Sequence, residues 1–381
     1  MAREQQRTAT RERLLAAAVE LFSRNWISQV SVADICRTAG MSNGAYYRYF
    51  SSREEIFLEI LNRYYTMLSS ALETVDGDSI EQRIANLCMV VFRLSEEQRD
   101  ITQVFRQGQY RYYDYELKIN QLYEQHLTHT LGRTPSAGEL IFVMAGIRFS
   151  AFRRTYHQVA IDADAVTDLI LRGVFRRDTP DWERVFGIDV QPLPLKLQET
   201  TPEKLLASGK SILGKTGFHG MNIYRLTSAS GLGVGTFYNY FEGKEQFTEK
   251  IIEMISHQIR QFISSNLESG ISRLEKELQG MVLFAFYISN VDPSCYNIVR
   301  EAEFVTPAAV RRYYDDFAKG YAKSSSGLRI TDSWLAGNML MGLSHYFGLA
   351  VLHDPAGYQE ASRKTLRDIS SLLTDGLKSN L

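Results

Sequence analysis

The sequence predicts an all-α protein built from two related halves in one chain. Apolar residues recur at helical spacing over most of the 381 residues, and few runs alternate with the period of two that is typical of strands. The hydrophobic fraction of 44% suits a globular chain with a buried core. A stretch near the N-terminus, residues 42–54, returns in altered form at residues 233–245. A long internal repeat indicates a duplicated structure, so we expect both halves to fold alike.

The repeat has a constant offset of 191 positions, which is half the chain length, and it extends without gaps back to residues 12–16 and 203–207. It pairs residues of the same kind: Gly40 with Gly231, Gly44 with Gly235, Tyr47 with Tyr238, Tyr49 with Tyr240, Phe50 with Phe241, Arg53 with Lys244, and Glu54 with Glu245. Later landmarks recur at slightly larger offsets, because Gly146 matches Gly342 and His157 matches His353. The repeat therefore spans each whole half.

The composition excludes several classes of protein. The three cysteines, Cys36, Cys88 and Cys295, lie far apart without CxxC spacing, which argues for a reduced compartment and against a disulfide scaffold or zinc site. The N-terminus lacks the apolar run of a secretory signal. The most apolar stretch, residues 334–352, is interrupted by polar residues, so it is expected to be a buried core helix and not a membrane span. We expect a soluble cytoplasmic protein.

The first half divides into helices as follows. Residues 1–10 are polar and basic and are expected to form a mobile arm, and residues 11–24 carry one apolar stripe. Ser31 is a candidate N-cap for a short second helix, and Gly40 stands where a tight turn tolerates positive φ. Ser42 caps a third short helix that ends near Phe50, and a fourth helix follows through Tyr64. Further amphipathic helices are expected at residues 80–94, 100–110, 112–131, 136–157 and 162–177.

A proline-containing linker and a second set of helices follow. Residues 178–202 hold four of the eight prolines, which predicts a semi-rigid linker with Trp182 and Phe186 as candidate anchors. The later helices are expected at residues 203–215, 223–230, 234–241, 244–264, 333–353 and 359–377. The predicted domains are a head at 1–64, a body at 65–178, the linker at 179–202, a second head at 203–255 and a second body at 256–381.

Each head contains two short helices joined by a glycine turn, the pattern of a helix-turn-helix whose second helix enters the DNA major groove. Residues 1–53 carry eight basic and four acidic residues, and residues 201–244 carry five basic and two acidic ones. Because the whole chain has a net charge of -1, positive charge collects at the two heads, as phosphate binding requires. Arg3 and Arg7 are placed where an N-terminal arm reaches a minor groove.

These stretches resemble the signature of the TetR family of bacterial repressors. The residues at the signature positions of the first head are Ala39, Gly40, Met41, Ser42, Gly44, Ala45, Tyr46, Tyr47, Tyr49, Phe50, Arg53 and Glu54. In the second head they are Ser230, Gly231, Leu232, Gly235, Thr236, Phe237, Tyr238, Tyr240, Phe241, Lys244 and Glu245. The sequence departs from the family at Tyr49 and Tyr240, where histidine is usual, at Arg53, where lysine is usual, and at Gly233, which replaces the capping serine. Over residues 65–178 and 256–381 the resemblance is only architectural.

The resemblance implies an arrangement in which one chain does the work of a dimer. Members of the family are usually homodimers whose two heads bind a palindrome, whereas this chain already carries two heads. We therefore expect two TetR-like units that form an intrachain pseudo-dimer through the last two helices of each half. The heads are expected about 34–36 Å apart, or a multiple of that distance, to enter successive major grooves. Because the heads differ, the expected operator is an imperfect palindrome of double-stranded DNA.

The resemblance also assigns DNA contacts to named residues. Base contacts are expected from Asn43, Ala45, Tyr46 and Arg48 in the first head and from Val234, Thr236, Phe237 and Asn239 in the second. Phosphate contacts are expected from Ser31, Tyr47, Tyr49, Arg53, Asn222, Tyr238, Tyr240 and Lys244, and Ser42 is a further candidate for contact with DNA. The alternative for the aromatic residues is that they build the small core of each head, as Phe50 and Phe241 are expected to do.

The bodies of the family bind small, often apolar effectors, so an unknown small-molecule effector is implied here. Candidate contacts are Phe105, Tyr110, Tyr113, Arg148 and Phe152 in the first body and Glu301, Phe304, Tyr314 and His345 in the second. Aromatic stripes at helical spacing also build cores, which is the alternative for these residues. Glu301 has two alternatives, because it can neutralise a cationic ligand or pair with a nearby arginine.

The predicted function is a ligand-responsive transcriptional repressor without cofactor, metal or enzymatic activity. The glycine-rich residues 231–235 follow a helix and lack the Gly-Lys-Ser/Thr of a nucleotide loop, and His126 and His129 lack further metal ligands. No catalytic constellation is visible. Two alternatives stay open: a DNA-architectural protein without an effector, and a regulator in which only the first head is competent and the chain homodimerises.

Overall fold

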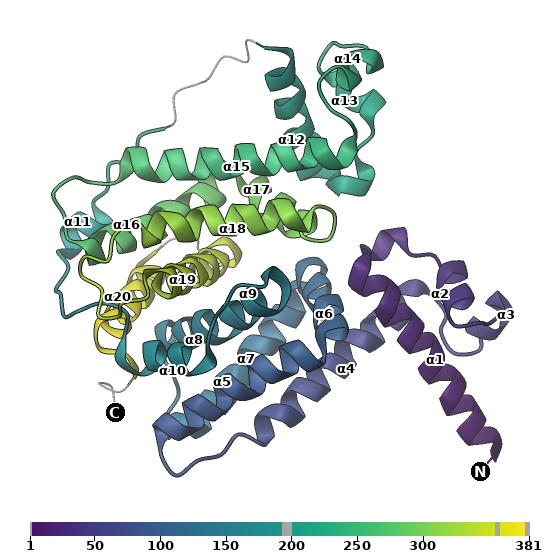
Figure 1. Ribbon diagram of the computed structural model, residues 1–381, viewed down its shortest axis with the longest axis horizontal. Helices are drawn as coiled ribbons and strands as arrows, with labels where there is room; N and C mark the ends of the chain where they lie inside the picture. Colours follow the sequence, from purple (N-terminus) through teal and green to yellow (C-terminus); the bar gives the residue numbers. More distant parts are fainter. Residues whose placement is uncertain (1, 193–199, 355–358, 378–381) are drawn as a thin grey trace. The chain divides into compact units, whose positions relative to one another are not determined.

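The computed structural model describes residues 2–192, 200–354 and 359–377. All regular elements in these ranges are helices, and the only β-type pairing in them is an isolated antiparallel bridge between Phe175 and Leu328 (Figure 1). The prediction of an all-α protein is thus confirmed. By its internal contacts the chain forms two compact units, residues 1–74 with 94–122, and residues 75–93 with 123–381. This division differs from the predicted domains, because it cuts through the first body.

The N-terminal helices follow the predicted order with one correction. Their bounds are α1 Ala2–Arg24, η1 Ile27–Gln29, α2 Val32–Thr38, α3 Asn43–Tyr46 and α4 Arg53–Glu73. Residues 2–10 are continuous with α1, so the expected mobile arm is wrong for them. Only the second part of α1 packs into the core. Its apolar stripe buries Leu14, Leu15 and Ala18, whereas residues 4–9 are exposed.

The helices that complete the first half run to residue 172. Their bounds are α5 Ile80–Glu97, α6 Arg99–Arg111, α7 Tyr113–Leu131, α8 Ala137–Met144, η2 Ala145–Phe149, α9 Ser150–His157 and α10 Ala163–Arg172. The predicted helix at 136–157 is interrupted by η2, a π-helical turn. Residues 173–177, expected to continue a helix, leave it at Gly173, whose φ of 79° ends α10. The Val174 and Phe175 N–H groups donate instead to the Leu373 carbonyl, at 2.7 and 2.8 Å.

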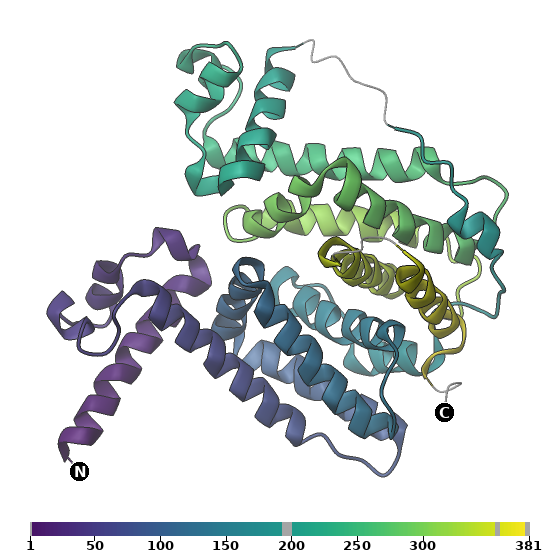
Figure 2. The same ribbon diagram turned by 180° about the vertical axis from the view of Figure 1, so that it is seen from behind.

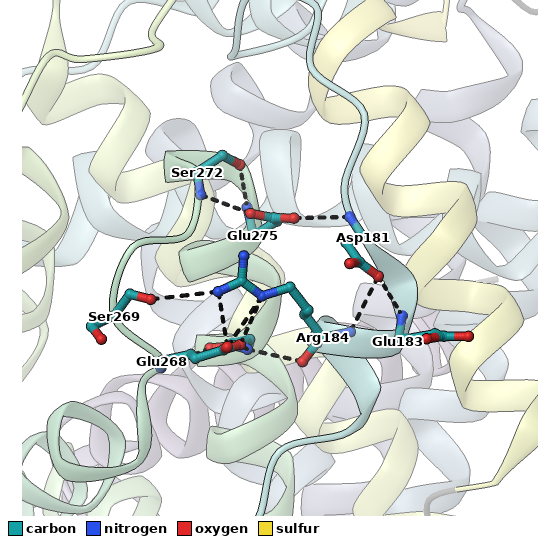
Figure 3. Close-up of polar contacts among 8 residues, drawn as sticks. Asp181, Glu183, Arg184, Glu268, Ser269, Ser272 and Glu275 are labelled. Carbon is teal, nitrogen blue, oxygen red and sulfur yellow. Dashed lines mark hydrogen bonds and ion pairs between the residues drawn. The ribbon is translucent and has the colours of Figure 1, made fainter.

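The described part of the predicted linker is docked on the second body through a short helix, α11 Trp182–Phe186. Asp181 caps this helix, and its N–H donates to Glu275 at 2.8 Å (Figure 3). Arg184 binds the Glu268 carboxylate with two nitrogens, at 2.8 and 3.1 Å. The Trp182 and Phe186 rings stack at 5.2 Å, and Arg367 lies over both. Residues 193–199 of the predicted linker lie outside the described residues.

The second half begins with four helices in the same order as α1 to α4. Their bounds are α12 Thr201–Gly220, α13 Ile223–Ala229, α14 Val234–Tyr238 and α15 Lys244–Asn266. The helices that follow are α16 Arg273–Phe286, η3 Tyr287–Val291, α17 Pro293–Ala302, α18 Pro307–Ala322, α19 Ser333–His353 and α20 Glu360–Asp375. Helix α19 is long and apolar enough to cross a membrane, but 78% of its apolar window is buried inside the protein. It is therefore placed as a core helix.

Helices from both halves pack together inside the second compact unit. Helix α8 lies along α20, and η2 lies along α19, as Figures 1 and 2 show from opposite sides. Two glycines allow these backbones to approach closely. A Cβ at Gly138 would lie 2.4 Å from the Asp368 Cβ, and one at Gly342 would lie 2.9 Å from the Ala145 carbonyl oxygen. Any larger residue at either position would push the helices apart.

A buried arginine joins the same helices. Arg153 of α9 has no exposed surface, and its guanidinium donates to Asn338 of α19 at 3.1 Å, to His157 at 2.6 Å and to Asp315 of α18. Its three nitrogens are thus each engaged, and the guanidinium lies 5.6 Å from the centre of the Tyr314 ring. Burial of the Arg153 charge without these partners would destabilise the folded protein. The hydrogen bonds therefore favour the arrangement in which α9 meets α18 and α19.

We predict that Arg153→Met, which roughly keeps the side-chain volume, lowers the free energy of unfolding by about 3 kcal/mol, because it leaves Asp315 and Asn338 without their buried donor. The matched control is Arg311→Met, which removes the other arginine on Asp315, a contact of 3.7 Å made by a side chain that is 46% exposed. It should cost less than about 1 kcal/mol. Chemical denaturation followed by circular dichroism measures both, and equal losses would contradict the assignment.

Candidate nucleic-acid interface

The first head holds α2 and α3 across a tight glycine turn. Gly40 has a φ of 64°, and the Met41 N–H donates to the Cys36 carbonyl at 2.8 Å, which closes the end of α2. Ser31 caps α2 by accepting from the Asp34 N–H, and Asp34 in turn accepts from the Ser31 N–H. Ser42 caps α3 through the Ala45 N–H at 3.3 Å. The helix-turn-helix expected from the sequence is thus formed.

Aromatic side chains build the core of this head. Tyr46 has no exposed surface, and its hydroxyl donates to the Ser52 carbonyl at 2.8 Å. Its ring lies 5.7 Å from that of Phe50, and burial raises the pKa of the Tyr46 hydroxyl. A side chain enclosed in this way cannot touch a base, so the expected base contact by Tyr46 is wrong. Phe237, at the same position of the second head, is also fully buried, and its expected base contact is wrong for the same reason.

The remaining predicted residues of the first head form its outer surface. Asn43, Arg48, Ser31 and Ser42 are exposed, Ala45 and Tyr49 are half-buried, and Tyr47 is 60% exposed. Arg53 behaves differently, because its Nη1 donates to the carbonyls of Ser28 and Val30 at 3.3 and 3.0 Å. It ties the start of α4 to the segment before α2. The sequence did not indicate this internal role.

The second head repeats the turn and the aromatic core. Gly231 has a φ of 69°, and the Leu232 N–H donates to the Thr227 carbonyl at 2.8 Å. Phe241 and Phe247 pack against Phe237, with ring centres 5.3 Å from it. Asn222 caps α13, but Gly233 offers no side chain to cap α14.

The outer surface of the second head is more aromatic and less charged than that of the first. Tyr238 is 57% exposed, Tyr240 48% and Val234 39%; Asn239 is exposed and Thr236 half-buried. Sequence reasoning missed Tyr224, which is 68% exposed and lies in the first turn of α13 together with exposed Arg225. The signal was available, because both follow the capping Asn222 at a helix start, where DNA-binding proteins often contact phosphate.

Lys244 is drawn inward. Its Nζ lies 4.1 Å from the centre of the Phe218 ring, and burial lowers the pKa of its ammonium group. Lys244 is therefore a poorer phosphate ligand than its position in the motif suggests.

Most of the residues expected to bind an effector have structural contacts. Phe105 is buried with Tyr64 and Tyr115, and Phe152 is packed among Phe149, His157 and Tyr314. Arg148 lies over the Tyr123 and Tyr346 rings, and Tyr110 accepts a hydrogen bond from Arg106 at 2.9 Å. Tyr113 and Phe304 are half-buried. Glu301 accepts a hydrogen bond from the Phe218 N–H at 3.0 Å. This contact is neither of the two expected ones, which were a cationic ligand and a nearby arginine.

Two predicted effector residues, Tyr314 and His345, line a narrow cavity in the second body. Helices α15 to α19 surround it. The lining is mostly apolar and aromatic, with Arg300, His345 and Tyr296 as its polar groups. The Tyr296 hydroxyl and His345 Nε2 lie 3.3 Å apart. Sequence reasoning did not find Tyr296 or Cys295, because the cavity depends on how five helices meet. Over the described ranges, no group of three or more His, Cys, Asp or Glu side chains is arranged to hold a metal.

Comparison with known proteins shows which family the first head resembles. Residues 14–60 match the model of bacterial regulatory proteins of the tetR family. The chain is 27% identical over 101 residues to the uncharacterized HTH-type transcriptional regulator YdgC of Bacillus subtilis, covering 25% of this chain and 52% of that protein. It is 29% identical over 90 residues to the HTH-type transcriptional repressor DhaR of Mycobacterium sp. (strain GP1), covering 24% of this chain and 44% of that protein. The match thus spans about half the length of these relatives.

Two solved structures resemble about half of the chain. A transcriptional regulator from Rhodococcus sp. Rha1 has a TM-score of 0.38 at 14% identity, over 46% of this chain and 96% of its own. The fatty acid degradation regulator FadR from Bacillus halodurans has a TM-score of 0.38 at 15% identity, over 48% of this chain and 99% of its own. The sequence match is the stronger result. Through residues 14–60 the chain carries the helix-turn-helix domain of the TetR family, a family of DNA-binding transcriptional regulators and not of enzymes.

Proposed function

We propose that this protein is a cytoplasmic TetR-type transcriptional regulator whose second half is a second TetR-like unit, so that one chain binds double-stranded DNA with two heads. One observation carries this proposal. The turns before α3 and α14 have the same positive-φ glycine and the same 2.8 Å closing hydrogen bond, although their sequences differ. A turn held in this way presents a recognition helix.

The packing of α8 to α10 with α19 and α20 supports pairing of the two halves within one chain. Its polar part is not symmetric. By the offset that relates Gly146 to Gly342, Arg153 corresponds to Leu349, and Asn338 corresponds to Phe142. Two first halves would place the buried Arg153 against Phe142, and two second halves would leave Asn338 facing Leu349. Either pairing strands a buried polar group, which favours the pairing of unlike halves.

The two heads offer different chemistry to DNA. Asn43 and Arg48 can bind base edges or phosphates by hydrogen bonds, whereas Val234 offers an apolar contact suited to a thymine methyl group. The exposed tyrosines of the second head, including Tyr224 and Tyr238, provide hydroxyl donors for phosphate oxygens. The operator we propose is therefore an imperfect palindrome, and the protein is proposed to act as a repressor on it.

The cavity of the second body is the proposed effector site. Its narrow interior, in which water-sized space amounts to about 10 Å³, holds roughly one water molecule, so an effector must displace side chains to enter. The polar groups Arg300 and His345 at an aromatic lining suit an apolar molecule with an anionic or hydrogen-bond-accepting end. Such a ligand changes DNA affinity only if it prefers one of the two shapes of the protein.

The full chain is first used to select an operator from a random DNA pool. We predict that Tyr47→Ala and Tyr238→Ala each lower the affinity for this operator by about 2- to 10-fold, the effect of one lost hydrogen bond. Tyr46→Phe is the buried control and should leave affinity unchanged. Fluorescence anisotropy measures all three. A loss confined to Tyr47→Ala would reject the second head as a DNA reader and favour a homodimer with one competent head per chain, which the mass of the complex on DNA detects.

We predict that Arg48→Ala weakens operator binding, and that the salt dependence tells which contact is lost: loss of one phosphate contact lowers the slope of log affinity against log salt concentration by about one. The slope is measured by titrating the same operator between about 50 and 200 mM salt. An unchanged slope with weaker binding would instead assign Arg48 to a base. If selection from the random DNA pool yields no preferred sequence, the alternative of a DNA-architectural protein without an effector is favoured.

We predict that n-alkanoates raise the melting temperature of the full chain more than the n-alkanols of equal length, because only the former carry an anionic end for Arg300. The variant Arg300→Gln should remove the difference between the two series. Differential scanning fluorimetry measures the shifts. Equal shifts in the wild-type chain would contradict the proposed polarity of the effector.

A further inference from the structure

A buried side-chain amide of α6 binds the backbone of the first head, and we call such a contact between head and body the seat of the head. Gln107 of α6 has no exposed surface. Its Oε1 accepts the Ile27 N–H at 2.6 Å, and its Nε2 donates to the carbonyls of Phe22 and Asn25 at 3.2 and 3.0 Å. The side chain thus satisfies three backbone groups where α1 ends, using both its acceptor and its donors. All of these residues belong to the first compact unit.

The second head is seated by a carboxylate at the equivalent place. Glu301 of α17 accepts the Phe218 N–H at 3.0 Å. Phe218 follows Ile27 by 191 positions, the offset of the repeat. The carboxylate also lies against the backbone at Gly217, whose φ is 68°; a Cβ there would be 2.7 Å from Glu301 Oε2. A carboxylate has no donor, so Glu301 cannot bind carbonyl groups as Gln107 does.

The surroundings of Glu301 make its charge unfavourable. Burial raises the pKa of Glu301, while the Phe218 N–H and Lys244 of α15 act in the opposite direction. Other titratable groups at this junction are His219 of α12, whose pKa is lowered by burial and by Lys244, and the ion pair of Lys210 of α12 with Asp292 at the start of α17, at 2.5 Å. A glutamate whose pKa is raised in the seated state binds its proton more tightly there than in water. The second head is therefore held most strongly at a pH below the ordinary pKa of a glutamate. It is held less strongly as the pH rises from that ordinary pKa through the raised pKa of Glu301.

Helix α17 also contacts the cavity of the second body. Tyr296 and Arg300 line that cavity, whereas Ser294 and Glu301 face α12, where a Cβ at Gly214 would lie 2.6 Å from the Ser294 Cβ. One helix therefore touches both the proposed effector site and the seat of the second head.

We propose that Gln107 and Glu301 are equivalent positioning residues that seat each head on its own body, and that the carboxylate makes the second seat the weaker, pH-dependent one. The first head is held by a neutral group that does not titrate. The second is held by a group whose ionisation opposes burial, so the second head is the one whose position changes more readily. This rests on the proposed function only in treating residues 203–255 as a head.

The test exchanges the two residues in the full chain without DNA. Hydrogen exchange, corrected for the intrinsic pH dependence of amide exchange, reports the protection of peptides from α1 and α12 between about pH 4 and pH 8. In the wild-type chain, protection of α12 should fall with rising pH, up to tenfold for each unit by which the pKa of Glu301 is raised. Protection of α1 should stay constant. Glu301→Gln should raise α12 protection at pH 8 and abolish its pH dependence, and Gln107→Glu should introduce the dependence in α1.

Two controls keep the test decisive. Lys244→Met removes the facing charge but leaves the titrating carboxylate, so the pH dependence of α12 should persist; its loss would transfer the role to Lys244 and overturn the proposal. If Gln107→Glu fails to fold, Glu301→Gln decides alone. Lower α12 protection at pH 8 in Glu301→Gln, or an unchanged pH dependence, would overturn the proposal. Because no DNA is present, a second head that does not bind DNA still gives a result, which separates this test from that of the proposed function.

Discussion

The structure of the second compact unit depends on the close packing of α8 and η2 against α20 and α19. The backbones approach within a distance that only glycine permits at Gly138 and Gly342, and Arg153 is buried at the same seam with Asn338 and Asp315 as partners. Helix α19 is apolar on nearly all sides and needs neighbours from both halves to be covered.

The two halves, which we propose to be related, differ in their polar residues. Core positions keep their chemistry, because Tyr46 and Phe237 fill the same space in each head. Surface positions have changed, so that Arg48 of the first head is matched by Asn239 of the second. At the junction of head and body, we propose that the amide of Gln107 and the carboxylate of Glu301 are equivalent.

Much of the fold could be predicted because its signals are local. Helical spacing predicted many of the helices, and α19 to the residue, but it gave no bounds for the helices between residues 273 and 322. Gly40 and Gly231 marked turns in which their φ is positive. The interruption by η2 was missed, because a π turn leaves the apolar spacing nearly unchanged. Tyr46 and Phe237 were expected to contact bases, and their place in the core was only the alternative. A motif indicates which residues belong to a recognition helix, but the rotation of a one-turn helix on its core decides which of them face outward.

The sequence by itself determined the helices, the glycine turns, the repeat and the resemblance to TetR regulators, since each follows from the order of neighbouring residues. Only the tertiary structure decided that Arg53 binds carbonyl groups, that Lys244 turns onto Phe218, and that Glu301 holds a backbone N–H. These contacts join residues that are far apart in the chain or on different helices. Their partners are selected by burial and by the need to satisfy every enclosed polar group, which are properties of the packed chain and not of any stretch of it.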